Sequence, residues 1–239
     1  MKILFLGTSH GHPEIRRFCT SVYFEHKGNG FLIDAGAPVI YLLYNYRIPI
    51  TRVKSIFITH MHGDHTAELP TIAGSLWYHK EADLDCYFPQ ESGIDRLDHW
   101  ANVKNNSQFH PYTVTDGTFY ENYGIRVTAI RTEHCGTSVP SYAYMVETDE
   151  GDRVLFTGDL AYDFHDFPKI AFESHFDLIV SELVHLPADK AAEILKNVDT
   201  KLIIFSHLGE SNVQTLQKHN VSFKFPYVIA CDGFEYYVN

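Results

Sequence analysis

Four side chains that bind metal ions in proteins lie within six consecutive residues of this sequence. They are His60, His62, Asp64 and His65. Imidazole and carboxylate groups are ligands that suit Zn²⁺, and also Mn²⁺ or Fe²⁺. Residues two apart on an extended chain point the same way, so His60 and His62 can reach one ion, while Asp64 and His65 follow a bend at Gly63 and can face a second. Solvated loop histidines are the alternative, but the density of ligand types favours a metal site.

Three further ligand candidates each follow an apolar run. They are His134, Asp159 and His207, after the runs at 125–131, 154–157 and 202–205. Each residue taken alone is equally well explained as a cap or turn residue. Together they would supply the second half of a two-metal site, because polar residues that end neighbouring strands gather at one edge of a sheet.

The elements that must position these residues are short strands and helices. Apolar runs bounded by turn residues predict strands at 2–6, 21–26, 31–34, 53–59, 84–88, 109–114, 125–131, 142–148, 153–157, 177–181, 201–206, 227–231 and 235–238. Helical spacing of apolar residues predicts helices at 37–46, 66–78, 164–172, 188–195 and 212–218. His60 to His65 would then lie on a tight connector between a strand and a helix. The pattern indicates one α/β domain over residues 1–239, layered, with helices outside.

Composition limits the kind of partner. The 239 residues are 45% hydrophobic and 14% aromatic, which is enough for a substantial core, and we attribute the aromatic residues to core packing rather than base stacking. The net charge of −11 opposes binding of long nucleic acids, because neutralising phosphates needs Lys and Arg. A small anionic substrate, held by bound metal or one local cation, remains compatible with this charge. So does a homodimer.

The ends and the cysteines of the chain point to an intracellular setting. The apolar start is too short for a secretion signal, and no run of about 18 apolar residues could span a membrane. The four cysteines are separate, so neither a disulfide framework nor a cysteine-based zinc site is expected; they are Cys19, Cys86, Cys135 and Cys231. We therefore expect a cytoplasmic protein without a membrane partner.

This ligand pattern resembles the metallo-β-lactamase superfamily over nearly the whole chain. The family signature H-x-H-x-D-H is matched by residues 60–65, and its later His, Asp and His fall on His134, Asp159 and His207. The resemblance implies a four-layer αββα sandwich and two divalent ions, zinc in the first place, with Mn or Fe as alternatives. It implies one ion held by His60, His62 and His134, another by Asp64, His65 and His207, and Asp159 between them. β-Lactamases of this family usually carry Cys where Asp159 stands, which disfavours antibiotic hydrolysis.

Within the superfamily, the two ends of the chain resemble the ribonuclease Z and phosphonate-pathway phosphodiesterase branch. The matches are Leu6-Gly7-Thr8, Pro13, Cys19-Thr20-Ser21 and Asp232-Gly233-Phe234-Glu235. Glu182 and His185 match an acidic residue and a histidine that follow a strand in that branch. Two features are missing. The 24 residues between His134 and Asp159 leave no room for the tRNA-gripping arm of ribonuclease Z, and the early Cys cluster of the phosphonate-pathway enzyme is absent.

The resemblance predicts a dinuclear hydrolase, in the first place a phosphodiesterase acting on a small phosphodiester such as a cyclic nucleotide or a sugar phosphate. Two cations roughly 3.5–4 Å apart would activate a bridging water as hydroxide. Asp64 would orient that hydroxide. His185, supported by Glu182, would give a proton to the leaving group; an ordinary surface imidazole is the alternative for His185.

The first loop supplies the candidate substrate contacts. Arg16 and Arg17 could hold a phosphate through their planar guanidinium groups, although an ordinary surface pair is equally compatible. His10 and His12 could contact substrate or simply face water. Other functions compatible with the sequence are thioester or lactone hydrolysis on the same metals, an iron-dependent redox enzyme, and a ligand-binding protein with a vestigial site.

Overall fold

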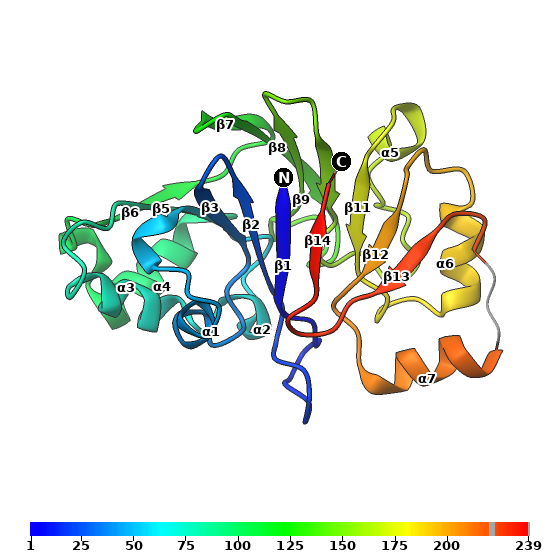
Figure 1. The fold of residues 1–239 in the computed structure, drawn as a ribbon, viewed down its shortest axis with the longest axis horizontal. Coiled ribbons are helices and arrows are strands. Elements are labelled where there is room, and N and C mark those ends of the chain that lie inside the picture. The colour runs from blue at the N-terminus through cyan, green and yellow to red at the C-terminus, as the bar shows by residue number, and fades with distance from the viewer. Residues whose placement is uncertain (220–222, 239) are drawn as a thin grey trace.

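Two seven-stranded sheets packed face to face form the centre of the molecule over the residues that the computed structural model describes, 1–219 and 223–238 (Figure 1). The first sheet has the order β14 (Glu235–Tyr237), β1 (Lys2–Gly7), β2 (Ser21–His26), β3 (Asn29–Ile33), β4 (Val53–Phe57), β5 (Leu84–Phe88) and β6 (Phe109–Thr113). The second has the order β13 (Tyr227–Ile229), β12 (Ile203–Phe205), β11 (Leu178–Ser181), β10 (Arg153–Phe156), β9 (Ser141–Thr148), β8 (Ile125–Thr132) and β7 (Gly117–Asn122).

Helices cover the outer face of each sheet. Those beside the first sheet are α1 (Val39–Asn45), α2 (Gly63–Thr66), α3 (Leu69–Leu76) and α4 (Glu91–Ala101). Those beside the second are α5 (Ile170–Glu173), α6 (Ala188–Leu195) and α7 (Glu210–His219). Two short 3₁₀ turns lie at Ile50–Arg52 and Val103–Asn105. Figure 1 shows α1, α3 and α4 on the left of the molecule and α6 and α7 on the right.

Successive side chains of a strand point to opposite faces of its sheet, so these elements form three apolar layers. In β1, Leu4 packs in the layer between the first sheet and its helices, whereas Phe5 packs between the two sheets. In β10, Leu155 packs under the helices of the second sheet, and Phe156 faces the first sheet. The predicted αββα sandwich in a single domain is therefore confirmed.

Strand pairing decides where the loops meet. β3, β4, β5 and β6 run parallel, as do β10, β11, β12 and β13, so their carboxyl ends lie at one edge of each sheet. At that edge α2 lies close to the lower ends of β1 and β2 in Figure 1. The two chain ends meet at the opposite edge, where β14 pairs with β1.

One expectation about the elements is wrong, and two elements were not predicted. The helix predicted at 164–172 is reduced to α5, because Phe164 has a positive φ of 55° and Pro168 cannot donate a helical hydrogen bond. Helix α4 was missed because its buried face consists only of Gly93, Ile94 and Leu97. The edge strand β7 was missed because most of its side chains are polar and solvent-facing.

No helix in the described part of the chain is both long and apolar enough to cross a membrane. All four cysteines have free thiols, as expected from their spacing.

Candidate metal centre

The histidine loop leaves β4 and is held from both sheets. Asp34, just after β3, accepts hydrogen bonds from the backbone N–H and the hydroxyl of Thr59, each at 2.8 Å. From the second sheet, the Tyr144 hydroxyl donates to the carbonyl of Ile58 at 2.7 Å, and the N–H of Tyr142 donates to the carbonyl of Thr59 at 2.9 Å. The loop is therefore fixed before its first histidine.

The tight connector predicted for residues 60–65 is shorter than expected, because Asp64 and His65 already belong to a helix. Both belong to α2, a single turn that begins at Gly63. The turn fits tightly against the chain after β3, because a Cβ at Gly36 would lie 1.6 Å from the carbonyl oxygen of Asp64. Only glycine permits this approach, which holds α2 against the chain that follows β3.

Three histidines form a first group of converging ring nitrogens. His60 Nε2 lies 2.9 Å from His62 Nδ1, and His134 Nε2 lies 3.2 Å from the same His62 atom. His60 is buried, whereas His62 is exposed and His134 is partly so. The first group is therefore buried at His60 and open to solvent at His62.

A second group lies next to the first. His65 Nε2 is 3.4 Å from Asp64 Oδ2, and His207 Nε2 is 3.9 Å from that same oxygen. Asp159 lies between the groups: its Oδ2 is 3.1 Å from His207 Nε2 and 3.7 Å from His134 Nε2. Asp64, His65 and His207 thus face one side of the Asp159 carboxylate, and the first group faces the other.

Gly158 lets Asp159 come this close to the histidine loop. Gly158 has a φ of 59°, and a Cβ there would lie 2.9 Å from Cβ of Thr59. A side chain at this position would strain the backbone and push β10 away from Thr59. In the Thr-Gly-Asp sequence, the glycine is therefore required for steric reasons, and the aspartate is the candidate ligand.

The donor set fits divalent cations. Three buried polar atoms of the centre have no hydrogen-bond partner: His65 Nε2, Asp159 Oδ1 and His207 Nδ1, the first two of which lie 3.5 Å apart. Leaving a buried carboxylate oxygen unpaired costs free energy on the order of 1–3 kcal/mol, which a bound cation would offset. Both His65 and His134 have Nδ1 placed to donate, to Asp34 and to the carbonyl of Leu160, which leaves each Nε2 free to bind metal.

Protonation states in the metal-free protein agree with this fit. Burial, with the nearby His65, lowers the pKa of His60 well below its usual value, so its imidazole is in the neutral form that binds metal. Burial would raise the pKa of Asp64, but the hydrogen bond and charge of His65 outweigh it and hold that pKa far below the ordinary range. Asp64 is therefore an anion.

His185 is not a surface imidazole, because Glu182 fixes it at the edge of the centre. Its Nδ1 lies 2.8 Å from both Glu182 oxygens, and the buried Glu182 also accepts the N–H groups of Leu160 and His185. With Nδ1 donating to Glu182, Nε2 is left for a substrate. The His185 ring centroid lies 4.7 Å from that of His134.

His10 and His12, both in the first loop, lie at different distances from the centre. The His10 ring lies 6.5 Å from the His207 ring, and its Nε2 is 3.8 Å from Glu14 Oε1. His12 is exposed, with Nδ1 3.1 Å from the carbonyl oxygen of Pro13. His10 is thus beside the centre, and His12 lies further out on the loop.

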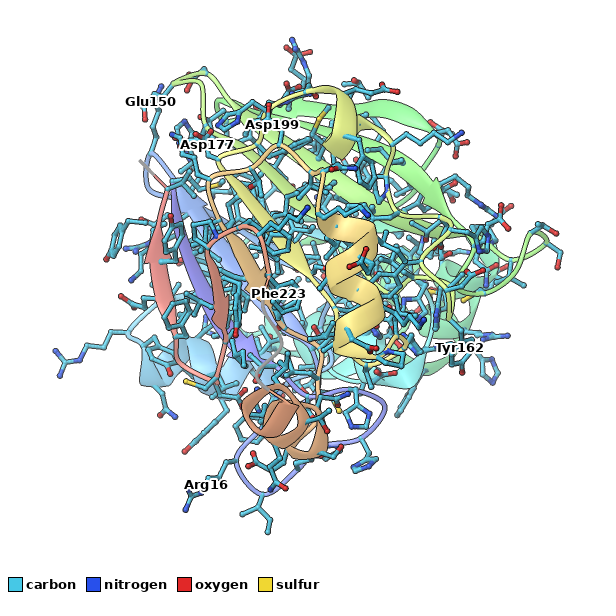
Figure 2. All side chains as sticks on the ribbon, turned by 90° about the vertical axis from the view of Figure 1, so that its right-hand side faces the viewer. Arg16, Glu150, Tyr162, Asp177, Asp199 and Phe223 are labelled. Atoms are coloured by element: carbon cyan, nitrogen blue, oxygen red, sulfur yellow. The ribbon has the colours of Figure 1, made fainter. Side chains whose placement is uncertain are left out.

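The two arginines have separate environments. Arg17 is buried, and its Nη1 donates to the Thr8 hydroxyl at 2.7 Å and to the carbonyl of Ala230 at 2.8 Å. Thr8 in turn donates to Asp232 at 2.7 Å, so the matched residues of the two chain ends form one network. Arg16 is exposed, and Figure 2 shows it at the lower edge of the molecule, pointing away from the body.

A groove of about 610 Å³ runs along this loop, lined by His12, Pro13, Glu14, Ile15, Arg16, Arg17 and Glu210.

Three residues near the centre were not singled out from the sequence. Asp34 holds His65, and its position as the last residue of a predicted strand was a usable signal. Tyr162 is 75% exposed, and its ring lies 5.1 Å from the His185 ring, edge to face. Cys135 directly follows His134, and its thiol is one of the groups that converge on the first site.

The chain is similar to known proteins over much of its length. Ribonuclease Z from Bacillus velezensis is 32% identical over 168 residues, which cover 67% of this chain and 53% of that protein. The chain thus spans about half the length of the curated relatives it matches.

Solved structures of the same fold cover almost the whole chain. The metallo-β-lactamase fold protein YhfI from Bacillus subtilis superposes with a TM-score of 0.80 at 22% identity, covering 98% of each chain. A diphosphatase of the PhnP family superposes with a TM-score of 0.77 at 17% identity, covering 100% of this chain and 98% of the other.

These findings define the class: the metallo-β-lactamase superfamily, in the branch that includes ribonuclease Z, as the sequence motifs predicted. More narrowly, the model of the family described as Anti-Pycsar protein Apyc1 matches residues 1–202, and the chain belongs to that family.

Proposed function

We propose that this protein is a two-metal phosphodiesterase that hydrolyses a small phosphodiester such as a cyclic nucleotide or a sugar phosphate. The observation that carries the proposal is the arrangement of seven ligand-type side chains in two groups that share Asp159, with His185 on their open side. The same seven residues were expected from the sequence, and their assignment as ligands is part of this proposal.

The residues present would hold two divalent ions. His60, His62 and His134 would hold the first, and Asp64, His65 and His207 the second, with Asp159 between them. Bound there, two such ions would acidify a water and neutralise charge on a phosphoryl group. Imidazole and carboxylate donors suit zinc, and manganese or iron are the alternatives.

The remaining residues act on the substrate and its protons. Asp64, an anion between His65 and His207, orients the attacking water. His185, held at Nδ1 by Glu182, presents Nε2 to the leaving oxygen and gives it a proton. Tyr162 offers an exposed aromatic face beside His185 against which a nucleobase can pack.

The phosphodiester assignment draws on the relatives. Ribonuclease Z and a diphosphatase both cleave bonds to phosphorus, so their likeness favours phosphoryl chemistry over thioester or lactone hydrolysis. RNA is the second candidate substrate, favoured by about 30% identity to ribonuclease Z. The net charge of −11 favours the small substrate. A homodimer and a cytoplasmic location also remain proposals.

A substrate panel tests the proposal. Metal-loaded protein is assayed with cyclic mononucleotides, bis-p-nitrophenyl phosphate, a structured RNA and a set of thioesters and lactones. We expect turnover of the small phosphodiesters, and its loss in Asp64→Ala with the fold retained by circular dichroism. Thioester turnover without phosphodiester turnover would reject the proposal, and preferred cleavage of RNA would replace the small substrate.

Elemental analysis of the purified protein tests the metal content. We expect about two divalent ions per chain. A single iron per chain would instead support the redox alternative.

A further inference from the structure

Cys135 lies in a tight turn that brings its thiol to the first group of histidines. The turn follows β8 and is closed by a hydrogen bond of 2.7 Å from the N–H of Gly136 to the carbonyl of Glu133. Gly136 has a φ of 75°, a conformation that glycine adopts without strain. His134 and Cys135 are therefore adjacent in sequence and both available to the same site.

The thiol converges with the imidazoles. Sγ of Cys135 and one ring nitrogen each of His60, His62 and His134 all lie within 4.8 Å of one another. With Zn–S of about 2.3 Å and Zn–N of about 2.0–2.1 Å, a tetrahedral ion separates sulfur from nitrogen by roughly 3.6 Å. The sulfur and the three nitrogens therefore lie close enough together to bind one ion.

A second observation shows that this position calls for a cation. The Asp159 carboxylate, with only 3% of its side chain exposed, directs Oδ2 at this group: that oxygen lies 3.8 Å from His60 Nε2 and 3.7 Å from His134 Nε2, too far for a hydrogen bond to either. A buried carboxylate that faces two imidazoles without a hydrogen bond to either is stabilised when a cation occupies the space between them.

We propose that Cys135 is an additional protein ligand of the first ion, beside His60, His62, His134 and the shared Asp159, and that it makes this position selective for zinc. The thiol loses its proton to solvent as the metal–sulfur bond forms. Thiolate ligands favour zinc, whereas manganese prefers oxygen ligands, so a shell that includes a sulfur discriminates between the two metals. The proposal adds a ligand to the set implied by the family resemblance, and it rests on the metal site of the proposed function but not on its substrate.

Cobalt substitution tests the bond directly. Apo-protein titrated with Co²⁺ should develop an intense near-ultraviolet sulfur-to-cobalt charge-transfer band. Cys135→Ser should lose the band, while Cys231→Ser, a change at an exposed cysteine, should keep it. Absence of the band in the unmodified protein, or its persistence in Cys135→Ser, would overturn the proposal.

Metal competition tests the selectivity. We expect Cys135→Ser to weaken zinc binding at the first position by about tenfold or more and to leave manganese binding nearly unchanged. Equal changes for the two metals, or no change for zinc, would contradict the assignment.

Alkylation of the unmodified protein removes any dependence on how the variants fold. Iodoacetamide labelling, located by mass spectrometry, should slow at Cys135 when zinc is added and remain unchanged at Cys231. Equal labelling of Cys135 with and without zinc would reject the bond. None of these readouts requires turnover, so an inactive substrate panel with an intact cobalt band would reject the proposed function and leave this inference standing.

Discussion

Asp34 Oδ2 accepts a hydrogen bond from His65 Nδ1 at 2.8 Å, with both side chains buried. The two residues are 31 positions apart in sequence and are joined because β3 and β4 run parallel to the same edge. The bond fixes which nitrogen of His65 faces Asp159, and the negative charge makes that nitrogen a better ligand.

Asp34→Asn should therefore weaken binding of the second ion by about 10- to 100-fold, because the amide carries no charge to support His65. Isothermal titration of apo-protein with zinc measures this change. Asp149→Asn is the matched control: Asp149 also pairs with a histidine, His26, at 2.8 Å, but it lies outside the centre. Equal zinc affinity in the two variants would show that Asp34 has no role in metal binding.

His185→Ala should slow substrates with poor leaving groups far more than activated aryl esters. Only a poor leaving alkoxide needs the proton that His185 supplies, and such proton transfer contributes about 10²–10⁴-fold to a rate. The measurement is kcat for an alkyl and a p-nitrophenyl phosphodiester. Equal losses on both would remove His185 from the acid role.

Tyr162→Ala should raise KM for nucleotide substrates by about five- to tenfold and leave KM for a phosphodiester without a base unchanged, because stacking on an aromatic ring acts only on the base. Stability should not change, since the side chain is 75% exposed. Tyr237→Ala is the control, because this exposed tyrosine pairs opposite Lys2 at the other end of β1. An identical shift for both substrate types would argue against a base-packing role.

Stability at acid pH should depend on Asp177. Burial opposes its charge, but Lys201 Nζ at 2.6 Å and the N–H of Arg153 at 2.8 Å outweigh burial and lower its pKa. Because the folded pKa lies below the unfolded value, this stabilisation is present above about pH 4 and is lost as the pH falls through the folded pKa.

Asp177→Asn should therefore cost about 1–2 kcal/mol of unfolding free energy at pH 7 and much less near pH 2, as measured by urea denaturation. Asp199→Asn, at an exposed residue near the same edge in Figure 2, should have little effect at either pH. A pH-independent cost at Asp177 would assign its effect to geometry rather than charge.

Local chemistry made much of the centre readable from the sequence. His60, His62, Asp64 and His65 are one or two residues apart. Such a cluster of ligand types can be recognised in the sequence without knowledge of the fold, because neighbours on a short loop must lie close together. The strands that precede Asp159 and His207 are apolar runs whose ends are visible in the sequence. Helix α4 was not visible, because its few apolar residues carry little periodic signal.

Other features depended on contacts between distant segments. The environment of Arg17 depends on its hydrogen bonds to Thr8 and Ala230. These two residues come from opposite ends of the chain and lie close together only because β1 pairs with β14. The sequence alone could not distinguish this structural arginine from a phosphate anchor, because both uses need the same guanidinium group.

By itself, then, the sequence determined the fold class, the superfamily and the seven candidate ligands, since these are written in short motifs and in apolar periodicity. The tertiary structure alone decided that Asp34 supports His65, that Glu182 fixes His185, and that Cys135 and Tyr162 lie beside the centre. Those relationships depend on strand order and on the approach of two sheets, which bring together residues that no local pattern connects.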